Sequence, residues 1–390
     1  MKLEIPSYVK VLMNELFYNG YSCYVVGGAV RDTILNKEVH DYDLTTNAKP
    51  EEMVKVFEAY ITIPTGLKHG TLTVLSNNHQ VEVTTYRLDN DYVDHRHPTS
   101  VTFTDNIKED IERRDFTING FAYNDAEGLL DFFNGKEDLE NKIIRCIGNP
   151  EDRFEEDALR ILRAIRFSVQ LGFDIEEETK KAIFAKQDLL SFISKERIRD
   201  ELLLTLKYPC SKVFDEYAEI FRSALFFFPP INPDKLSTLD NKENEYTKLA
   251  LLLEDASLES AKDLLEELKL SKHEINLVLS YLKYKDFKFE SRIDLKYFLS
   301  DFFYPLDDYL NYRKTKDERF LIYKVRNYLD EIKDREDIYS LKDLAINGDD
   351  VVALGYRGSE ISQALNKALA LVIEEKVNNN KEDLIKAISE

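Results

Sequence analysis

The sequence GGAVRD at residues 27–32, followed by DYD at residues 41–43, decides the fold of the N-terminal part of the chain. The run YVV that precedes it, at residues 24–26, is typical of a buried strand. The two glycines let the backbone turn tightly, and the residues from Ala29 to Leu35 favour a helix. The stretch therefore predicts a strand, a turn, a helix and a second strand that carries two carboxylates.

These predicted elements have the chemistry of a triphosphate site. Free backbone N–H groups at the helix start, next to Gly28, can bind phosphate, and Arg31 can add a charge-assisted hydrogen bond. On an extended strand Asp41 and Asp43 point to the same side, where they repel each other unless cations lie between them. Two Mg²⁺ ions can activate a hydroxyl and stabilise a leaving pyrophosphate. Glu82, on a predicted strand of alternating polarity, is a candidate third acidic ligand. The alternative is an ordinary strand–helix–strand turn with solvated carboxylates.

The composition narrows the class of protein. The chain has 390 residues, which predicts more than one domain, and a formal net charge of −20, which argues against a general polyanion-binding surface. Any contact with RNA is therefore expected in a local basic groove. The 3 cysteines lie far apart, so neither a zinc ribbon nor a disulfide framework is expected. The sequence shows no signal peptide and no membrane-spanning run, which predicts a soluble cytoplasmic protein.

The pattern along the chain changes near Asp152. The residues before it mix short apolar runs with turn signals such as Asn134-Gly135. After it the periodicity is helical and glycine is scarce. The proline-rich stretch 226–233 is the clearest break, and residues 234–390 are compatible with helix almost throughout. The sequence therefore predicts an α+β head, made of a small sheet and helices, followed by an all-α remainder.

A second polar cluster lies in RRDFTIN at residues 113–119. The planar guanidinium of Arg114 can bind triphosphate oxygens. Asp115 can accept a hydrogen bond from a ribose hydroxyl, and Asn119 can fix that geometry. The alternative is a helix start with exposed ion pairs, which stabilise a protein little. Taken alone, the stretch does not decide between the two.

The sequence EEDALRILRAIR at residues 155–166 predicts an amphipathic helix. At about 100° per residue, Asp157, Arg160 and Arg163 lie on one face and Arg166 lies on its flank. The opposite face is an apolar stripe of Ala158, Ile161, Leu162, Ile165 and Val169. One interpretation is a solvated face with an Asp157–Arg160 ion pair. Three arginines at a strict three-residue period favour a function beyond that.

Asp157 and Arg160 have the hydrogen-bonding groups needed to read a nucleobase. Asp157 can accept from the exocyclic amine of cytosine or adenine, and Arg160 can donate to the ring nitrogen beside that amine. Uracil and guanine present a ring N–H beside a carbonyl, so both contacts would fail and discrimination would be large. One pair of side chains can thus choose C and A without a nucleic-acid template.

Together these stretches resemble those of class II tRNA nucleotidyltransferases, the bacterial CCA-adding type within the polymerase β superfamily. The resemblance extends from residue 20 to about residue 200, in the family's order and at its spacing. It implies that Asp41 and Asp43 bind Mg²⁺. It also implies that Asp157 and Arg160 form the protein template for the base. The further contacts with CTP or ATP would be Gly28, Arg31, Arg114, Arg163 and Arg166.

The resemblance further implies a sea-horse shape with four parts. Residues 1–140 would be the catalytic head, 141–200 the neck that selects the base, 201–285 a helical body and 286–390 a helical tail that binds tRNA. The expected activity is template-independent addition of CCA to the 3′ acceptor end of tRNA, with release of pyrophosphate, by a monomer or homodimer. Lys195, Arg197 and Arg199 are candidates for contact with the acceptor stem.

Close relatives leave several alternatives open. An enzyme that adds only A or only CC shares these motifs, as does a bacterial poly(A) polymerase. The segment 86–103 resembles the family's flexible loop at full length, which favours CCA or A addition. A poly(A) polymerase usually has a basic C-terminal extension, and the residues from Asn380 onward contain no basic run. A silent RNA-binding protein is disfavoured by the intact carboxylates and arginines. Aromatics interleaved with basic residues at 281–289 and 309–316 could form an RNA surface, but most of them are expected to serve helix packing.

Overall fold

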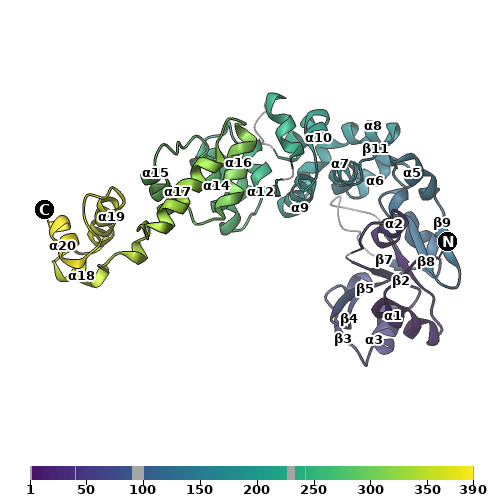
Figure 1. Ribbon diagram of the computed structural model, residues 1–390. Coiled ribbons are helices and arrows are strands. Elements are labelled where there is room, and N and C mark those ends of the chain that lie inside the picture. The colour runs from purple at the N-terminus through teal and green to yellow at the C-terminus, as the bar shows by residue number, and fades with distance from the viewer. Residues whose placement is uncertain (1, 40, 90–100, 226–232, 242, 390) are drawn as a thin grey trace. The chain divides into compact units, whose positions relative to one another are not determined.

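The computed structural model describes residues 2–39, 41–89, 101–225, 233–241 and 243–389 (Figure 1). These residues divide into two compact units, Met1–Pro230 and Ile231–Glu390, and each unit is described by itself. Most of the predicted loop at 86–103 and of the predicted junction at 226–233 lies outside the described residues. The predicted α+β head followed by helices is confirmed.

A seven-stranded sheet in the order β3-β4-β5-β2-β1-β8-β9 forms the core of the first unit. Neighbouring strands are antiparallel except β2 and β5, which are parallel. The predicted strand at 81–86 is β5, and the turn signals near Gly128 join β8 to β9. The strands of the sheet are β1 (Cys23–Val26), β2 (Asp43–Thr46), β3 (Ile61–Ile63), β4 (Thr71–Ser76), β5 (His79–Thr85), β8 (Phe121–Asn124) and β9 (Gly128–Asp131).

The predicted strand, turn and helix are present at residues 23–34. All four residues of β1 are buried, because β1 lies between β2 and β8 in the sheet. Gly27 then adopts a φ of +69°, a conformation that glycine allows without steric cost, and α2 (Gly28–Ile34) begins at the next residue. In the β1–β2 register Val26 lies opposite Asp43, so the turn and the first residue of β2 meet at the same end of the sheet.

Helices cover the sheet and support the turn. Helix α1 buries Val9, Leu12 and Leu16 along one side. Gly135 starts another helix where only glycine fits, since a Cβ there would lie 2.2 Å from the carbonyl oxygen of Thr117. The remaining elements of this region are α1 (Ser7–Tyr18), α3 (Pro50–Val56), β6 (Arg87–Asp89), β7 (Val101–Phe103), α4 (Ile107–Glu112) and α5 (Gly135–Asn141).

Helices dominate the rest of the first unit, with one exception to the expected pattern. Strand β11 (Asp174–Ile175) lies within the region expected to be helical after residue 152, and it forms a two-stranded parallel pair with β10 (Ile143–Ile144). The expected apolar stripe is buried, and α7 packs against α9 and α6. The helices are α6 (Pro150–Glu156), α7 (Leu159–Leu171), α8 (Glu177–Ala185), α9 (Lys195–Leu206), α10 (Ser211–Glu216) and α11 (Ala218–Ala224).

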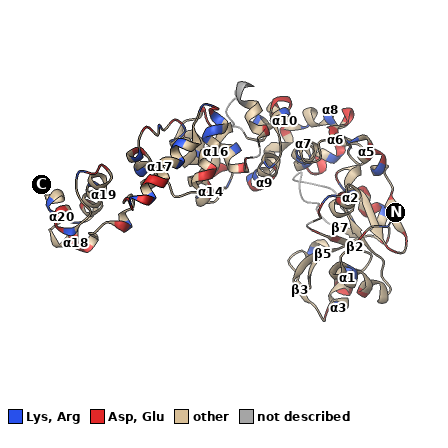
Figure 2. Ribbon diagram, viewed as in Figure 1, with Lys and Arg blue, Asp and Glu red and all other residues tan. Residues whose placement is uncertain are grey.

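The second unit is helical, as predicted. Tyr281, Tyr309 and Tyr312 are fully buried. Tyr281 packs against the other two rings and Tyr309 packs against Phe298, which confirms the packing role expected for these aromatics. Lys and Arg alternate with Asp and Glu along its helices (Figure 2). No helix in the described residues is both long and apolar enough to span a membrane. The helices are α12 (Glu245–Leu252), α13 (Leu258–Glu267), α14 (Lys272–Lys283), α15 (Arg292–Asp301), α16 (Leu306–Lys316), α17 (Ile322–Asp334), α18 (Gly348–Ala353), α19 (Ser359–Ile373) and α20 (Lys381–Ser389).

Candidate active site

Three carboxylates gather at the start of β2. Strand β2 begins at Asp43, so Asp41 precedes it, and the parallel register places Asp43 beside Glu82 of β5. Removal of solvent from its carboxyl group and the charge of Glu82 raise the pKa of Asp43, Arg114 opposes this shift, and Asp41 adds to it. The carboxylates are therefore close enough to repel one another, and a divalent cation would relieve that repulsion.

The donor set fits a metal that shares its ligands with a substrate. Asp41, Asp43 and Glu82 are all exposed to solvent. Within the described part of the chain, no group of three or more His, Cys, Asp or Glu side chains forms a ready-made metal cluster. A Mg²⁺ ion commonly binds through one or two carboxylates and completes its shell with phosphate oxygens and water. Asp41 and Asp43 supply what such an ion needs from the protein.

Two guanidinium groups stand beside the diglycine turn. A Cβ on Gly27 would lie 3.3 Å from Nη1 of Arg114, and a Cβ on Gly28 would lie 3.5 Å from Nη2 of Arg31. The Nη2 atom of Arg114 is 3.4 Å from Oδ2 of Asp110, whereas its buried Nε has no hydrogen-bond partner among the described residues. An anion seated on the turn would meet these positive groups and the N–H groups that start α2.

A buried chain of hydrogen bonds runs from α2 to α7. Arg31 donates from Nη1 to Oδ1 of Asn119 at 2.6 Å, and Nδ2 of Asn119 donates to Oδ1 of Asp115 at 3.0 Å. Oδ2 of Asp115 accepts from Nε and Nη2 of Arg163 at 2.9 and 2.6 Å. Burial alone would raise the pKa of Asp115, but Arg163 and these hydrogen bonds lower it to about 2. The predicted contact between Asp115 and Asn119 is therefore present, with both side chains buried.

The alternative interpretation of residues 157–166 as a solvated polar face is wrong for Arg160 and Arg166. Arg160 and Arg166 are each only 7% exposed, because α7 packs against α9 and Arg160 lies against the carbonyl oxygen of Arg113. Glu201 of α9 accepts from Nε of Arg166 at 2.6 Å and lies 3.7 Å from Nη1 of Arg163. Burial disfavours ionisation of Arg163, but Asp115, Glu201 and the more remote charge of Asp157 raise its pKa above the ordinary value.

Phe167 is a site neighbour that the sequence pattern does not indicate. The guanidinium carbons of Arg31, Arg163 and Arg166 lie 5.0, 5.4 and 4.0 Å from the centre of its ring. Such cation–π contacts are favourable when the groups are shielded from solvent. Phe167 and Glu201 read as ordinary helix residues in the sequence, since their roles depend on which helices pack together.

The Asp157–Arg160 ion pair of the same alternative interpretation is not formed, since each side chain has another charged partner. Asp157 lies in the break between α6 and α7, at φ −141° and ψ 99°, and not on the helix with Arg160. Its Oδ1 accepts from the N–H of Leu159 at 3.1 Å, and a local bond of this kind ends one helix and starts the next. Arg197 of α9 completes the contacts of the carboxylate, with Nη1–Oδ1 at 3.1 Å and Nη2–Oδ2 at 2.8 Å.

Arg160 is held by other partners. Its Nη1 donates to Oε2 of Glu156 at 2.8 Å and to the carbonyl oxygen of Arg153 at 3.1 Å. Its Nη2 donates to the carbonyl oxygen of Arg113 at 2.7 Å. A guanidinium has five donor hydrogens, so these contacts leave donors on Nε and Nη2 for a ligand. The side chain is thus fixed in place while part of its hydrogen-bonding capacity stays open.

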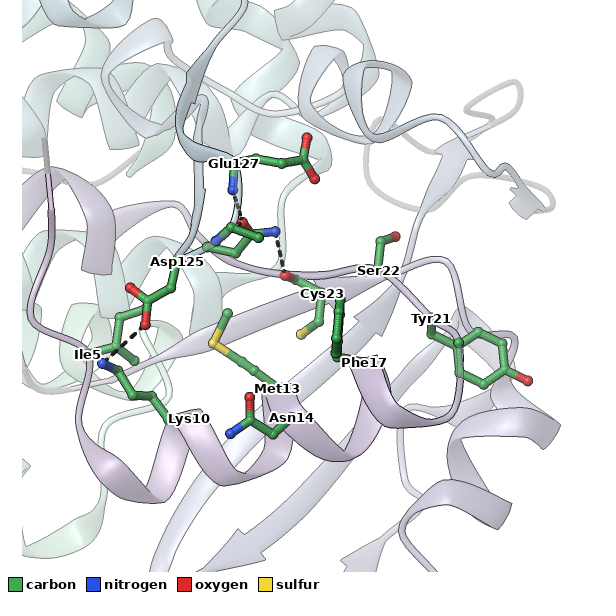
Figure 3. Close-up of a pocket in the computed structure, with 13 residues that line it drawn as sticks. Ile5, Lys10, Met13, Asn14, Phe17, Tyr21, Ser22, Cys23, Asp125 and Glu127 are labelled. Carbon is green, nitrogen blue, oxygen red and sulfur yellow. Dashed lines mark hydrogen bonds and ion pairs between the residues drawn. The ribbon is translucent and has the colours of Figure 1, made fainter.

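A cavity of about 600 Å³ lies at the other end of β1 (Figure 3). Lys10 and Asp125 form an ion pair across it, 3.2 Å apart. Its walls come from α1, the start of β1 and the turn after β8, and they include Met13, Phe17 and Cys23. No predicted site residue lines this cavity, so its size does not mark the catalytic centre.

Comparison with known proteins follows the same division of the chain. The family model described as the Poly A polymerase head domain matches residues 23–145. The model of a probable RNA and SrmB-binding site of polymerase A matches residues 172–219. The model described as tRNA nucleotidyltransferase domain 2, putative, matches residues 237–388. The first match contains Asp41, Asp43 and the diglycine turn.

Two curated relatives carry the same description. The CCA-adding enzyme of Staphylococcus aureus (strain MRSA252) is 32% identical over 387 residues, which cover 96% of this chain and 95% of that protein. The CCA-adding enzyme of Lactobacillus helveticus (strain DPC 4571) is 50% identical over 184 residues, which cover 47% of this chain and 46% of that protein.

Solved structures agree with this similarity. The Bacillus stearothermophilus CCA-adding enzyme in complex with CTP matches with a TM-score of 0.81 and 28% identity, over 99% of this chain and 98% of that one. A tRNA nucleotidyltransferase complexed with a primer tRNA and an incoming ATP analog matches with a TM-score of 0.63 and 26% identity, over 83% of this chain and 99% of that one. Because the similarity spans nearly the whole of this chain and of its Staphylococcus aureus relative, the chain belongs to the family of CCA-adding enzymes, the tRNA nucleotidyltransferases.

Proposed function

We propose that this protein adds the nucleotides C, C and A to the 3′ end of tRNA in the cytoplasm, from CTP and ATP and without a nucleic-acid template. The observation that carries the proposal is a continuous hydrogen-bonded chain. It joins the diglycine turn, through Arg31, Asn119 and Asp115, to Arg163 of α7. Arg160, on the same helix as Arg163, donates to the carbonyl oxygen of Arg113, so the proposed base-reading end of α7 is bonded to the same stretch, residues 113–119, as the proposed triphosphate seat. Relatives named CCA-adding enzyme match nearly the full chain and support this activity.

The diglycine turn and the carboxylates of Asp41 and Asp43 would carry out the phosphate chemistry. The N–H groups at the start of α2 and the guanidinium of Arg114 would hold the triphosphate. Asp41 and Asp43 would hold two Mg²⁺ ions, with Glu82 as a further acidic group. Such ions, when bound, would activate the terminal ribose hydroxyl of tRNA and stabilise the departing pyrophosphate. Arg31, Asp115 and Asn119 are proposed nucleotide contacts whose present bonds to one another fix the wall of the site.

Side chains at the break between α6 and α7 would select the base. An exocyclic amine would donate to the carboxylate of Asp157, and the remaining donors of Arg160 would bind the adjacent ring nitrogen. Glu156 and two backbone carbonyls keep Arg160 in one position, so the pair can reject a base with the reverse pattern. Arg163 and Arg166 would add positive charge beside the nucleotide.

The tRNA acceptor end is the proposed partner. The helical body at 201–285 and tail at 286–390 would hold the tRNA, and the head and neck at 1–200 would carry the chemistry. Of the cations considered for the acceptor stem, Lys195 donates to the carbonyl oxygen of Ala224 and Arg199 pairs with Asp200. The protein would act as a monomer or a homodimer.

Three tRNA primers test the proposal: one that ends before the CCA sequence, one that ends after the first C and one that ends after the second C. Each is incubated with the protein and one triphosphate at a time, and the products are sized. We expect C addition to the first two primers and A addition to the third. Addition of A to all three with long products would indicate a poly(A) polymerase, and addition to only some primers would indicate an A-only or CC-only enzyme.

A further inference from the structure

We propose that Arg197 is a positioning residue for base selection, and that it fixes the plane of the Asp157 carboxylate before a nucleotide binds. This inference rests on the proposed reading of the base by Asp157. The two residues are 40 positions apart in the sequence, and α9 brings Arg197 to the break between α6 and α7. Both guanidinium–carboxylate contacts are short, at 2.8 and 3.1 Å.

Asp157 needs such a partner because no helix holds it. It lies between two helices, and its own backbone contact with Leu159 reaches only Oδ1. A single bond to one oxygen leaves the carboxylate free to rotate about its terminal torsion, which is broad for Asp. The fork of Arg197 engages both oxygens at once and therefore sets the plane of the group.

The fork also leaves a defined place for the base. A carboxylate has about four lone-pair sites on its two oxygens. Oδ1 accepts from Leu159 and from Arg197, whereas Oδ2 accepts only from Arg197 among the described residues. The open position on Oδ2 is the one that an exocyclic amine can occupy. The side chains of Asp157 and Arg197 are 19% and 24% exposed, so a ligand can reach the pair.

The place of Arg197 on its helix supports a role beyond helix stability. It is the third residue of α9, in the first turn, where the helix dipole disfavours a cation. An arginine there gains its favourable contacts from Asp157 and not from its own helix. Lysine carries the same charge as a single point, without the planar fork, so it cannot set the plane of the carboxylate in the same way.

The experiment compares kcat/KM for CTP and for UTP on a tRNA primer that lacks CCA. The variants are Arg197→Gln, Arg197→Lys, Asp157→Ala and Arg222→Gln, and thermal unfolding is recorded for each. Arg222 is a matched control, because it is an exposed arginine of α11 that donates to the carbonyl oxygen of Ala218 on its own helix. We expect Arg197→Gln to lower the preference for CTP over UTP by about tenfold or more, and Arg197→Lys by less. Arg222→Gln should keep the preference of the original protein.

The outcomes separate this inference from the proposed function. An unchanged preference in a folded Arg197→Gln variant would overturn the positioning role. If that variant does not fold, Arg197→Lys carries the test, and an unchanged preference there has the same meaning. An unchanged preference in Asp157→Ala would instead overturn the reading of the base by Asp157. A loss of preference in Asp157→Ala, but in neither Arg197 variant, would leave the proposed function intact and reject the role of Arg197.

Discussion

Asp43 is the proposed metal ligand whose surroundings in the folded chain disfavour its charged form. Its carboxyl has a raised pKa in the folded chain, because partial loss of water around the carboxyl group and the neighbouring charge of Glu82 disfavour the ionised form. The native state thus holds this proton more tightly than the unfolded state does. The ionised carboxylate destabilises the fold as pH rises through the folded pKa, and the effect vanishes well below the unfolded value.

Two results are therefore expected for Asp43→Asn. Nucleotide addition should fall by more than the roughly 10- to 100-fold that is typical when an outer partner of a metal ligand is lost. Relative to the original protein, the free energy of unfolding in urea should rise at about pH 7. It should stay unchanged at about pH 3, where the aspartic acid of the original protein and the amide of the variant are both neutral. Retained turnover, or a loss of stability at the higher pH, would contradict the assignment.

The pKa of Asp115 is shifted in the opposite direction to that of Asp43. Its folded pKa is lowered to about 2, so its ionised form stabilises the protein above the unfolded pKa, and this contribution is lost as pH falls from about 4 to about 2. Asp115→Asn should therefore lower the free energy of unfolding by about 2 kcal/mol at neutral pH. The gap between the variant and the original protein should close in acid. Urea titrations at several pH values measure it, and a gap that does not change with pH would exclude the charged pair with Arg163 as its cause.

At this scale the sequence predicts chemistry better than contacts. The functional interpretation of the stretch 113–119 places Asn119 beside Asp115, and the two side chains are hydrogen-bonded, because they lie only four residues apart. The sequence does not predict that Glu201 pairs with Arg163 and Arg166, since Glu201 lies on another helix. The alternative of a solvated arginine face fails for Arg166 because α9 packs over it.

Secondary structure elements explain where the prediction for residues 155–166 fails. Helical periodicity identifies the apolar stripe of α7 correctly, because burial of that stripe drives the packing. The periodicity cannot show that the chain leaves the helix at Asp157. A carboxylate that bonds to the N–H two residues ahead competes with the helix, and here that local bond prevails. The break also frees Asp157 from the surface of the helix and lets Arg197 reach it.

The turn between β1 and α2 makes a prediction about its two glycines. Gly27 has a positive φ, and a Cβ added to it would lie 3.3 Å from Nη1 of Arg114. Gly27→Ala should therefore cost about 1–2 kcal/mol of stability. Gly28 has no such constraint, and alanine at the helix start should keep or slightly raise stability. Its methyl group would instead hinder the triphosphate, so the KM for CTP should rise by about tenfold.

Urea unfolding and steady-state kinetics on both glycine variants check this pair. The comparison is internal, since the same substitution is made at neighbouring positions. Equal losses of stability in the two variants would contradict the account of the turn. An unchanged KM for CTP in Gly28→Ala would contradict the placement of the phosphates.

At the scale of the whole molecule, the chain consists of two compact units with separate cores. The sequence predicts an α+β part followed by helices, since the change of periodicity near residue 152 is strong. It does not predict the strand order of the sheet, because β1 pairs on one side with nearby β2 and on the other with β8, which lies about 100 residues further along the chain. The period of apolar residues in a strand indicates which face of the strand is buried. It does not indicate which other strand lies beside that strand.

The two units make a prediction about truncation. All proposed nucleotide contacts lie in Met1–Pro230, so a protein of residues 1–230 should fold and bind CTP within about threefold of the full chain. Its affinity for tRNA should fall by about tenfold or more, since contacts of the helical unit with the phosphate backbone are lost. Circular dichroism, calorimetric titration with CTP and filter binding of tRNA measure these effects. Undiminished tRNA affinity would show that the second unit serves another purpose.

Arg160→Ala is the most direct test of base selection by side chains at the break between α6 and α7. The protein and this variant are each given a tRNA primer that lacks CCA, with all four triphosphates in competition, and the added nucleotides are sequenced. The account predicts that the original protein adds C and that the folded variant adds U alongside C, with the preference for C lowered by about tenfold or more. An active variant that still adds only C would contradict it.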